Sequence, residues 1–498
     1  MEKAEAVREP IKYIHLDRKQ LRWEAVDLEQ LIAEDHPARL IWEVSGGLEL
    51  SRFEHEQKSR TGSAGRPCWP ARLLVSVWVY SYTLGIASAR AIERMMYHEP
   101  GLRWLAASET INYHTLADFR VGHQSALEDL FAQFLALLDD VGMVDLRTLV
   151  HDGTKVKAVA GRRSLHRRKT LEKRLRQARR AVRELDRQAA EEEALDKRRQ
   201  AAQARAAKEA LERAQAALKK LQELEASRNA SEQSQLRVSE SEAEARHMKQ
   251  PDGGWAPSYN VQISTEMQSR MIVGIRVTTA ANDTQELVPA LEKVKENCGE
   301  LPVTIIADNG YATRSNVEQT SEQDIEFIAP WKEDRSREAG ACARHGIAAE
   351  FAPSVFRVQR GGQGLICPAG KNLVIIQQKT HHGVLKNVFE ARSSDCRRCR
   401  WRRSCCGKNG GPRQIERVVE SPAMKRYLKR MKRPEVRQLY GKRSEIAEFP
   451  HLWMKALKRW RRFSVRGLLK TGLEALWVAL SYNISQWIRL RQVAPASA

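Results

Sequence analysis

The sequence predicts an α/β fold in which a mixed sheet forms the core, with an all-helical domain before it and two insertions within it. Strand-like apolar runs alternate with helical patterns around residues 145–160 and 251–330, as in chains that cover a sheet with helices. Residues 162–250 contain neither Gly nor Pro and are rich in Ala, Glu, Lys, Arg and Leu, which is typical of long helices. A cysteine-containing stretch after residue 330 then breaks the alternation and marks the second insertion.

The chain carries an excess of positive charge that suits a binder of polyanions. Its 498 residues include 84 Lys and Arg against 62 Asp and Glu, so the formal net charge is +22. Between Arg392 and Arg443 there are 18 basic and four acidic residues, which predicts a localised basic surface. Neutralising nucleic-acid phosphates releases counterions and favours binding, whereas an enzyme of small metabolites has no need of this imbalance.

Composition also predicts where the protein works. The first residues, MEKAEAVREP, are charged and lack the apolar core of a signal peptide. The apolar runs 73–86 and 473–488 are interrupted by polar residues and fall short of the ~20 clean apolar residues of a membrane span. Eight cysteines are few for this length and argue against a secreted disulfide framework. We therefore expect a cytoplasmic protein without a membrane partner.

Residues 1–143 are predicted to form a helical, DNA-binding domain of helix-turn-helix type. Ser88 precedes Ala-Arg-Ala-Ile-Glu as a helix N-cap would, and a further helix is expected to start near Thr115. Candidates for reaching DNA are Arg90, Arg94 and Arg120. The alternative is an ordinary helical domain whose arginines are merely solvated.

The first part of the core, residues 144–161, contains an aspartate after a short apolar run. Thr148-Leu-Val leads into Asp152, and Gly153 predicts a turn directly afterwards. An acid next to Gly at a strand end is a common site geometry and an equally common turn. Both interpretations stay open for these residues alone.

Residues 162–250 are predicted to be a coiled-coil helical insertion. Apolar residues recur at spacings of 4 and 3 from Leu171 to Ala189 and again from Ala207 to Leu221. The stretch between these series lacks good core positions, so we expect two long helices folded back as an antiparallel hairpin. Because no turn residue marks a bend, one uninterrupted helix is the alternative.

The core continues over residues 251–330, where the apolar period changes to two. Tyr259–Ser264 and Met271–Thr278 alternate as the strands of a hairpin joined by a short polar turn. NDTQELVPALEKVKENCG follows as a helix with Asp283 or Thr284 at its cap.

A fully apolar strand, Val303–Ala307, then ends at Asp308. A strand buried on both faces implies helices on both sides of the sheet, and an acid at its carboxyl end points into a crevice. We therefore favour a functional role for Asp308 over a simple turn.

Residues 331–435 are predicted to be a basic insertion with a cysteine cluster. The cluster consists of Cys367, Cys396, Cys399 and Cys405. A C-x2-C pair with a third thiolate nearby and a fourth at a distance can enclose tetrahedral zinc, and reduced, unliganded thiols are the alternative. The arginines among these thiols suit contacts with phosphate in either case, and include Arg397, Arg398 and Arg400.

The last segment, residues 436–498, contributes C-terminal helices and a third acid. The stretch YGKRSEIAEFPHLWMK contains Tyr440, Arg443, Glu448 and Lys455. If it is helical, its glutamate and last lysine are two turns apart on one face. Pro450 fits best in a first turn, so we expect Glu448 near the start of a helix that continues to residue 462.

These elements follow the order β-β-β-α-β-α-β-α. In a mixed sheet of that order the first and fourth strands can lie side by side, so that Asp152 and Asp308 meet and a later helix brings Glu448 to them. Three carboxylates there can hold two Mg²⁺ or Mn²⁺ ions, which prefer oxygen ligands.

At this point the chain resembles the DDE transposases of bacterial insertion sequences, in the branch with a Tyr-Arg-Glu-Lys signature around the third acid. The resemblance covers nearly the whole chain and rests on GRPCWPARLL, HDGTKVKA, SYNVQ, ADNGYAT, the CPAG and cysteine cluster, and YGKRSEIAEFPHLWMK. It implies an RNase H-like core with a metal-binding triad at Asp152, Asp308 and Glu448. The signature residues that contact transposon-end phosphate or position the reaction are then Tyr440, Arg443 and Lys455.

The resemblance also implies what the protein does and with which partners. Such enzymes cleave DNA at terminal inverted repeats and transfer the freed 3′ ends into target DNA, acting as a homodimer on DNA in the bacterial nucleoid. Two departures from the family stand out: Glu445 competes with Glu448 as the third acid, and INYHTLADFR lacks an Asp that such proteins often have. An RNase H-like nuclease without strand transfer and a catalytically idle DNA-binding relic are the alternative functions.

Overall fold

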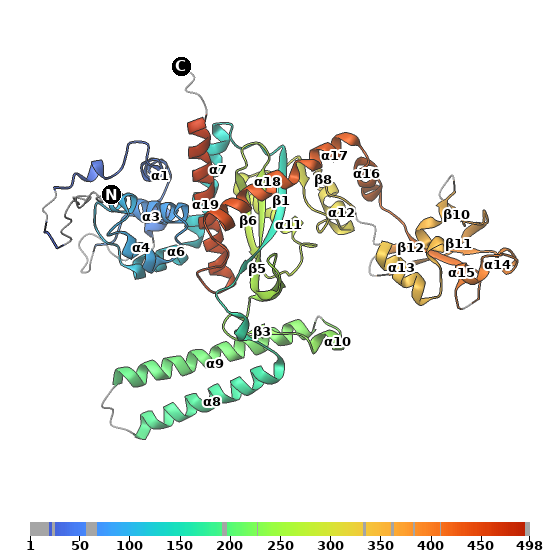
Figure 1. Ribbon diagram of the computed structural model, residues 1–498, viewed down its shortest axis with the longest axis horizontal. Helices are drawn as coiled ribbons and strands as arrows, with labels where there is room; N and C mark the ends of the chain where they lie inside the picture. Colours follow the sequence, from blue (N-terminus) through green and yellow to red (C-terminus); the bar gives the residue numbers. More distant parts are fainter. Residues whose placement is uncertain are drawn as a thin grey trace, which may run out of the picture.

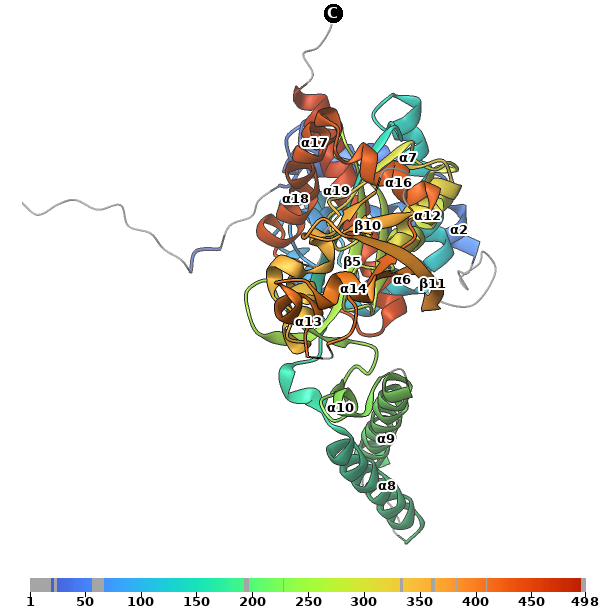
Figure 2. The ribbon, with the colours of Figure 1, turned by 90° about the vertical axis from the view of Figure 1, so that its right-hand side faces the viewer.

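The computed structural model describes residues 19–21, 25–55, 67–191, 197–226, 228–331, 335–359, 363–381, 384–408 and 410–493. A central sheet is flanked on one side by the N-terminal helices and on the other by a small β-rich module (Figure 1). A pair of long helices projects away from the sheet in both views (Figure 2). The predicted α/β class is confirmed at this level, since helices accompany a sheet with both parallel and antiparallel pairs.

The N-terminal part is helical, as predicted. Its elements are η1 (Leu28–Leu31), α1 (Pro37–Gly46), α2 (Ser51–His55), α3 (Ala71–Thr83), α4 (Ala89–Met95), α5 (Pro100–Leu105), α6 (Tyr113–Gly122) and α7 (Gln124–Asp140). The Ser88 side chain accepts a hydrogen bond from the Ala91 amide, so the predicted cap of α4 is confirmed. The helix expected near Thr115 starts two residues earlier, because Asn112 caps it instead.

Arg120 does not reach toward DNA, contrary to expectation. It is 6% exposed, and its Nη1 donates to the Ala87 carbonyl at 2.7 Å and to Ser464 Oγ at 2.7 Å. Its guanidinium also lies 4.6 Å from the centre of the Trp78 ring. Arg120 thus ties α6 to the C-terminal part of the chain, while Arg90 and Arg94 stay exposed.

The central sheet contains both parallel and antiparallel pairs. Its strands are β1 (Thr148–Lys157), β4 (Arg246–Lys249), β5 (Trp255–Glu266), β6 (Ile272–Thr278), β7 (Thr304–Ile306) and β8 (Glu326–Ile328). The order is β4-β5-β1-β7-β8, and β6 also pairs with β5. β1 is antiparallel to β5 and parallel to β7, so the predicted adjacency of the first and fourth strands is confirmed.

The turn expected at Gly153 is absent from the structure. β1 runs straight through Asp152 and Gly153, which pair with Ile263 and Gln262 of β5. A Cβ at Gly153 would lie 2.6 Å from Gln262 Nε2 and 2.7 Å from Asp283 Oδ1. Glycine is therefore needed here for a close approach to these side chains and not for a bend.

Helices cover both faces of the sheet. α11 (Leu287–Cys298) and α12 (Arg314–Glu322) pack on one face together with α16 (Pro422–Arg430). α17 (Pro434–Gly441) and α18 (Arg443–Leu452) pack on the other through Val436, Ile446 and Ala447. This two-sided burial agrees with the apolar sequence of β7.

The first insertion is a hairpin of two long helices, as predicted. α8 (Arg168–Glu191) and α9 (Lys197–Ala226) lie side by side, and the expected bend falls at residues 192–196, outside the described residues. Near the base of the hairpin, Leu171 is buried against Ala217 and Leu221. β2 (Leu165–His166) pairs with β3 (Val238–Ser239), and α10 (Ala230–Gln233) lies between α9 and β3.

The second insertion has a five-stranded antiparallel sheet of its own, in the order β13-β12-β11-β10-β9. Its strands are β9 (Arg357–Val358), β10 (Gly364–Ile366), β11 (Asn372–His381), β12 (Val384–Ala391) and β13 (Gln414–Val418). Its helices are α13 (Arg335–Arg344), η3 (Ala349–Phe351), η4 (Pro353–Val355), α14 (Ser393–Arg397) and α15 (Arg402–Cys406). We call this unit the cysteine module.

The C-terminal helix α19 (Leu468–Val493) joins the parts together. Trp477, Leu480 and Ile484 lie in one continuous hydrophobic core with side chains of α3, α7, β5 and β6. In the described part of the chain, no helix combines the length and the apolar character that a bilayer crossing requires.

Glu474 is a test of this junction, because it is fully buried on α19. Its carboxylate accepts hydrogen bonds from Trp460 Nε1 at 3.0 Å and from the Ser464 amide and hydroxyl, each at 2.9 Å. Burial raises the pKa of Glu474, and nearby Arg120 lowers it. Glu474→Ala leaves these donors without an acceptor and removes the negative charge near buried Arg120, so we expect a loss of about 2–4 kcal/mol and a lower thermal midpoint by calorimetry.

The matched control is Glu292→Ala, since Glu292 is an exposed glutamate on α11. This change should alter stability by less than about 0.5 kcal/mol. Equal midpoints for the two variants would contradict a structural role for the Glu474 network.

Candidate active site

Two aspartates lie at adjacent interior strands of the central sheet, near the carboxyl end of β7. In the parallel pair of β1 and β7, Val150 lies opposite Ile306. Asp152 and Asp308 each follow two residues later, so they lie on the same face, with Asp152 inside β1 and Asp308 just after the end of β7. The Asp308 carboxylate accepts a hydrogen bond from the Gly310 amide at 2.7 Å, which holds the loop after β7.

The buried environment of Asp152 disfavours the charged form of its carboxyl group. Burial raises the pKa of Asp152 to about 6, and the negative charges of Asp308 and Asp283 add to this rise. Arg443 and the Gly153 amide act in the opposite direction and lower the pKa. Arg443 Nη2 lies 3.2 Å from Asp152 Oδ1.

α18 is the helix that closes over these aspartates. Its buried residues Ile446 and Ala447 pack against Val150 and Ile306 of the sheet. With those residues facing inward, Arg443 at the helix start and His451 near its end both turn toward Asp152. His451 Nδ1 is 3.9 Å from Asp152 Oδ2, and burial lowers the pKa of His451 to about 3, so the imidazole is neutral.

Lys455 reaches the same strand from the next turn. Residues after α18 form a π-helical turn, η5 (Trp453–Leu457), of the kind often found at functional sites. Lys455 Nζ donates to Thr154 Oγ1 and, at 2.9 Å, to the Lys155 carbonyl. Burial lowers the pKa of Lys455 to about 8, with a smaller contribution from Arg461 in the same direction.

Tyr440 completes the set of signature residues around the two aspartates. It is half-buried at the end of α17 and packs at the edge of the cluster that contains Val150 and Ile306. Burial raises the pKa of Tyr440, while Arg443 lowers it and the two aspartates raise it further. Tyr440 and Arg443 thus interact electrostatically with two aspartates that lie far from them in the sequence.

Glu448 lies on α18 but stays apart from the aspartates. It is exposed, and in the described structure it makes no hydrogen bond or ion pair with Asp152 or Asp308. The helix begins at Arg443 and keeps Pro450 inside it, so Glu448 lies mid-helix, contrary to the expectation of a helix start. It precedes His451 by three residues and therefore shares the helix edge that faces Asp152.

Glu445 points elsewhere. Its carboxylate forms an ion pair with Arg270, which follows β5, and its side chain is 69% exposed. Arg270 also lies 4.7 Å from the Phe449 ring centre. Glu445 thus holds α18 against the β5–β6 turn and is engaged away from the aspartates.

The donor set suits a hard divalent cation. Asp152 and Asp308 offer carboxylate oxygens only, and burial, with a smaller contribution from the Asp308 charge, raises the pKa of Asp152. Mg²⁺ and Mn²⁺ bind such oxygen ligands. Within the described residues, however, no three His, Cys, Asp or Glu side chains are grouped closely enough to form a metal centre.

A polar network lies behind β1, on the face opposite Asp152. His151 contacts Ser264 Oγ and Gln262 Oε1, each at 2.9 Å, and Tyr311 donates to Gln262 Oε1 at 2.6 Å. Gln262 Nε2 donates to Asp283 Oδ1 at 2.8 Å. Asp283 was expected to cap a helix, but α11 begins only at Leu287.

Sequence reasoning missed this network as part of the site. HDG and SYNVQ contain two of its members, His151 and Gln262, yet their contact depends on the antiparallel register of β1 and β5. Its effect on the site is electrostatic, since Asp283 raises the pKa of Asp152. Finding this network from the sequence would have required the register of β1 against β5.

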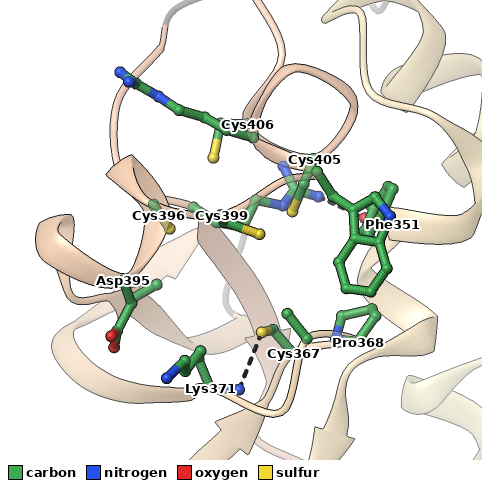
Figure 3. Close-up of a pocket in the computed structure, with 14 residues that line it drawn as sticks. Phe351, Cys367, Pro368, Lys371, Asp395, Cys396, Cys399, Cys405 and Cys406 are labelled. Atoms are coloured by element: carbon green, nitrogen blue, oxygen red, sulfur yellow. Dashed lines mark hydrogen bonds between the residues drawn. The ribbon is translucent and has the colours of Figure 1, made fainter.

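The remaining predicted residues lie in the cysteine module, away from the aspartates (Figure 1). Cys367, Cys396, Cys399 and Cys405 line one small pocket there, and Cys406 joins them (Figure 3). The exposed arginines Arg397, Arg398 and Arg400 surround this pocket's helices α14 and α15. The structure thus separates the thiols from the carboxylates.

Comparison with known families now adds to the geometry. Residues 366–488 match the model described as a transposase DDE domain, and residues 26–122 match the model of a transposase domain, DUF772. The two matches indicate an insertion-sequence DDE transposase. No curated protein and no solved structure matches the chain.

The matched regions fall on the parts that frame the site of the transposase. The first covers the cysteine cluster, the signature residues Tyr440 to Lys455 and most of α19, and the second covers the N-terminal helices up to α6. The strands that carry Asp152 and Asp308 lie outside both matches, so their pairing comes from the structure.

Arg443→Gln tests the electrostatics of the site. The guanidinium is the largest influence that lowers the pKa of Asp152, so its removal should raise this pKa above about 6. A carboxyl group must be ionised to hold Mn²⁺, and the pH midpoint of Mn²⁺ binding should therefore move upward by roughly one unit. Electron paramagnetic resonance of Mn²⁺ across pH would measure the midpoint.

Arg437→Gln is the control, because Arg437 is an exposed arginine on the neighbouring helix α17. It should leave the midpoint unchanged. The same midpoint in both variants would mean that Arg443 does not govern the ionisation of Asp152.

Proposed function

We propose that the transposase cleaves DNA at terminal inverted repeats and transfers the resulting ends into target DNA by a two-metal mechanism at Asp152 and Asp308. The observation that carries this proposal is the adjacency of these two aspartates under α18, a helix within the matched DDE domain. Two bound divalent cations would supply charge neutralisation on the attacking and leaving oxygens of the phosphodiester.

We assign Glu448 as the third acid. It shares the edge of α18 that carries His451, and it is free of ion pairs in the described structure, whereas Glu445 is engaged with Arg270. A change of side-chain rotamer brings a glutamate on this edge toward Asp152, because positions three apart on a helix are neighbours.

The basic residues around the aspartates would hold the DNA backbone. The Arg443 Nε–H has no hydrogen-bond partner although it is buried, which leaves a donor for a phosphate oxygen. Lys455 adds a cation beside β1, and the half-buried Tyr440 adds a hydroxyl. Arg397, Arg398 and Arg400 offer a second, exposed phosphate-binding surface on the cysteine module.

The chemistry balances without a covalent protein intermediate. In the first step water attacks the phosphorus at the element's end, the P–O3′ bond breaks, and a free 3′-OH leaves. In the second step that 3′-OH attacks a phosphodiester of the target, a new P–O bond forms, and the target's own 3′-OH is released. Tyr440 is therefore a positioning residue and not a nucleophile. Because two ends must be cut and joined together, we propose that the protein acts as at least a dimer.

A panel of four variants tests the assignment on DNA that carries the element's own ends. Asp152→Ala, Asp308→Ala and Glu448→Ala should each reduce Mg²⁺- or Mn²⁺-dependent cleavage and joining by on the order of 10³-fold, because each removes a metal ligand. Glu445→Ala is the matched control and should retain activity. Binding of the ends, measured by gel shift, should persist in all four.

The outcomes separate the alternatives. Cleavage without joining of a pre-cut end would favour an RNase H-like nuclease, and binding without either step in the wild type would favour an idle relic. Loss of activity in Glu445→Ala but not in Glu448→Ala would move the third acid to position 445.

A further inference from the structure

The cysteine module has only a small hydrophobic core of its own. Its buried apolar cluster consists of Phe356, Leu365, Leu373, Phe389, Ala391 and Ile415. The module stands apart from the main sheet in Figure 1, so it gains little from the large core of the chain. A structural metal can add stability to a unit with a small core, and all eight cysteines of the chain are free thiols.

Thiols from two separate places close one pocket in this module. Cys367 lies in the turn between β10 and β11, while Cys396, Cys399 and Cys405 come from the helical segment α14–α15. Their side chains line a cavity of about 30 Å³ together with Cys406 (Figure 3). Segments about thirty residues apart in sequence therefore present sulfur atoms to the same space.

The turn that carries Cys367 holds its sulfur in a fixed position. The Cys367 sulfur accepts a hydrogen bond from the Lys371 amide at 3.3 Å. The turn itself is closed by hydrogen bonds from the Cys367 amide to the Lys371 carbonyl and from the Gly370 amide to the Cys367 carbonyl, each at 2.8 Å. Hydrogen bonds of this kind orient a metal ligand.

The surroundings of the pocket suit a negatively charged metal–thiolate cluster. Arg413, which is 9% exposed, lines the pocket, and its Nε has no hydrogen-bond partner. A cation with an unpaired donor is otherwise costly to bury. Phe351 and Trp401 close the pocket with apolar rings 6.0 Å apart, which restricts water.

We propose that Cys367, Cys396, Cys399 and Cys405 bind one structural zinc ion that holds the cysteine module together. Four soft thiolates in tetrahedral geometry favour Zn²⁺ over the hard ions of the aspartate site. Since no three such ligands already stand at metal-binding distance in the described residues, binding requires the thiols to move closer together. The ion would tie α14 and α15 to the β10–β11 turn and so fix the exposed arginines Arg397, Arg398 and Arg400 on a rigid base.

Cys406 is the fifth thiol and not a ligand. It follows Cys405 directly on the last turn of α15, and its thiol is hydrogen-bonded to that of Cys396. Consecutive helical residues point in directions about 100° apart, so only one of the two can face the centre of the pocket. In Figure 3 the Cys405 sulfur lies beside that of Cys399, whereas the Cys406 sulfur lies on the far side of Cys396 from Cys367.

Metal analysis of the purified full-length chain tests the proposal. We expect one equivalent of zinc by plasma mass spectrometry, release of that zinc by a mercurial reagent, and thiolate-to-cobalt charge-transfer bands with tetrahedral d–d bands after Co²⁺ replacement. Cys396→Ser and Cys399→Ser should lose stoichiometric zinc, and Cys406→Ser and Cys68→Ser should keep it. Cys68 is an exposed thiol outside the module.

Other results would overturn the proposal. Wild-type protein without zinc after growth in zinc-supplemented medium, together with no Co²⁺ spectrum, would exclude the site. A disulfide among these cysteines by mass spectrometry, or an iron–sulfur chromophore, would exclude it as well. Zinc kept in Cys405→Ser and lost in Cys406→Ser would overturn the choice of the fourth ligand. The wild-type measurements remain decisive even if a serine variant fails to fold.

Discussion

The parallel pairing of β1 with β7 is the contact on which the site of this transposase depends. It is only three residue pairs long, from Thr148 with Thr304 to Val150 with Ile306. Because side chains alternate along a strand, a slip of one residue would send Asp308 to the opposite face from Asp152. The buried packing of Val150 and Ile306 against α18 prevents that slip, since it would expose an apolar side chain.

The closing helix α18 serves two purposes through its two sides. Its inner side, with Ile446 and Ala447, belongs to the core, and Arg443 and His451 reach Asp152 on the sheet. The π-helical turn after it changes the direction of the chain so that Lys455 reaches Thr154 and the Lys155 carbonyl. Arg443 and Lys455 thus flank Asp152 from either end of one helical segment.

The two candidate metal sites follow opposite chemical rules. At the two aspartates, hard oxygen donors lie in a partly buried site with basic residues that suit phosphate. In the cysteine module, soft sulfur donors line a small pocket with apolar walls and one buried guanidinium. Because the two donor sets differ in softness, the two proposed sites would select different divalent ions. The exposed arginines of the cysteine module, Arg397, Arg398 and Arg400, lie within the stretch from Arg392 to Arg443 for which the sequence predicts a localised basic surface.

Much of this arrangement follows from local sequence. Periodicity predicts the helical hairpin, the β5–β6 hairpin and the buried strand before Asp308, because each depends on which face of a short segment is apolar. The order of the elements along the chain predicts the adjacency of the two acidic strands. The cap at Ser88 depends on one side chain and one amide, and it too is predictable.

Contacts between distant segments could not be predicted from the sequence. The straight path of β1 through Gly153 is decided by the close approach of Gln262 and Asp283, which a local turn preference cannot register. The burial of Arg120 depends on Ala87 and Ser464, and the engagement of Glu445 depends on Arg270. The sequence by itself therefore determined which side chains could take part in the chemistry. Only the tertiary structure decided which of them meet, because the energy that selects among equivalent arginines and glutamates comes from long-range packing and desolvation.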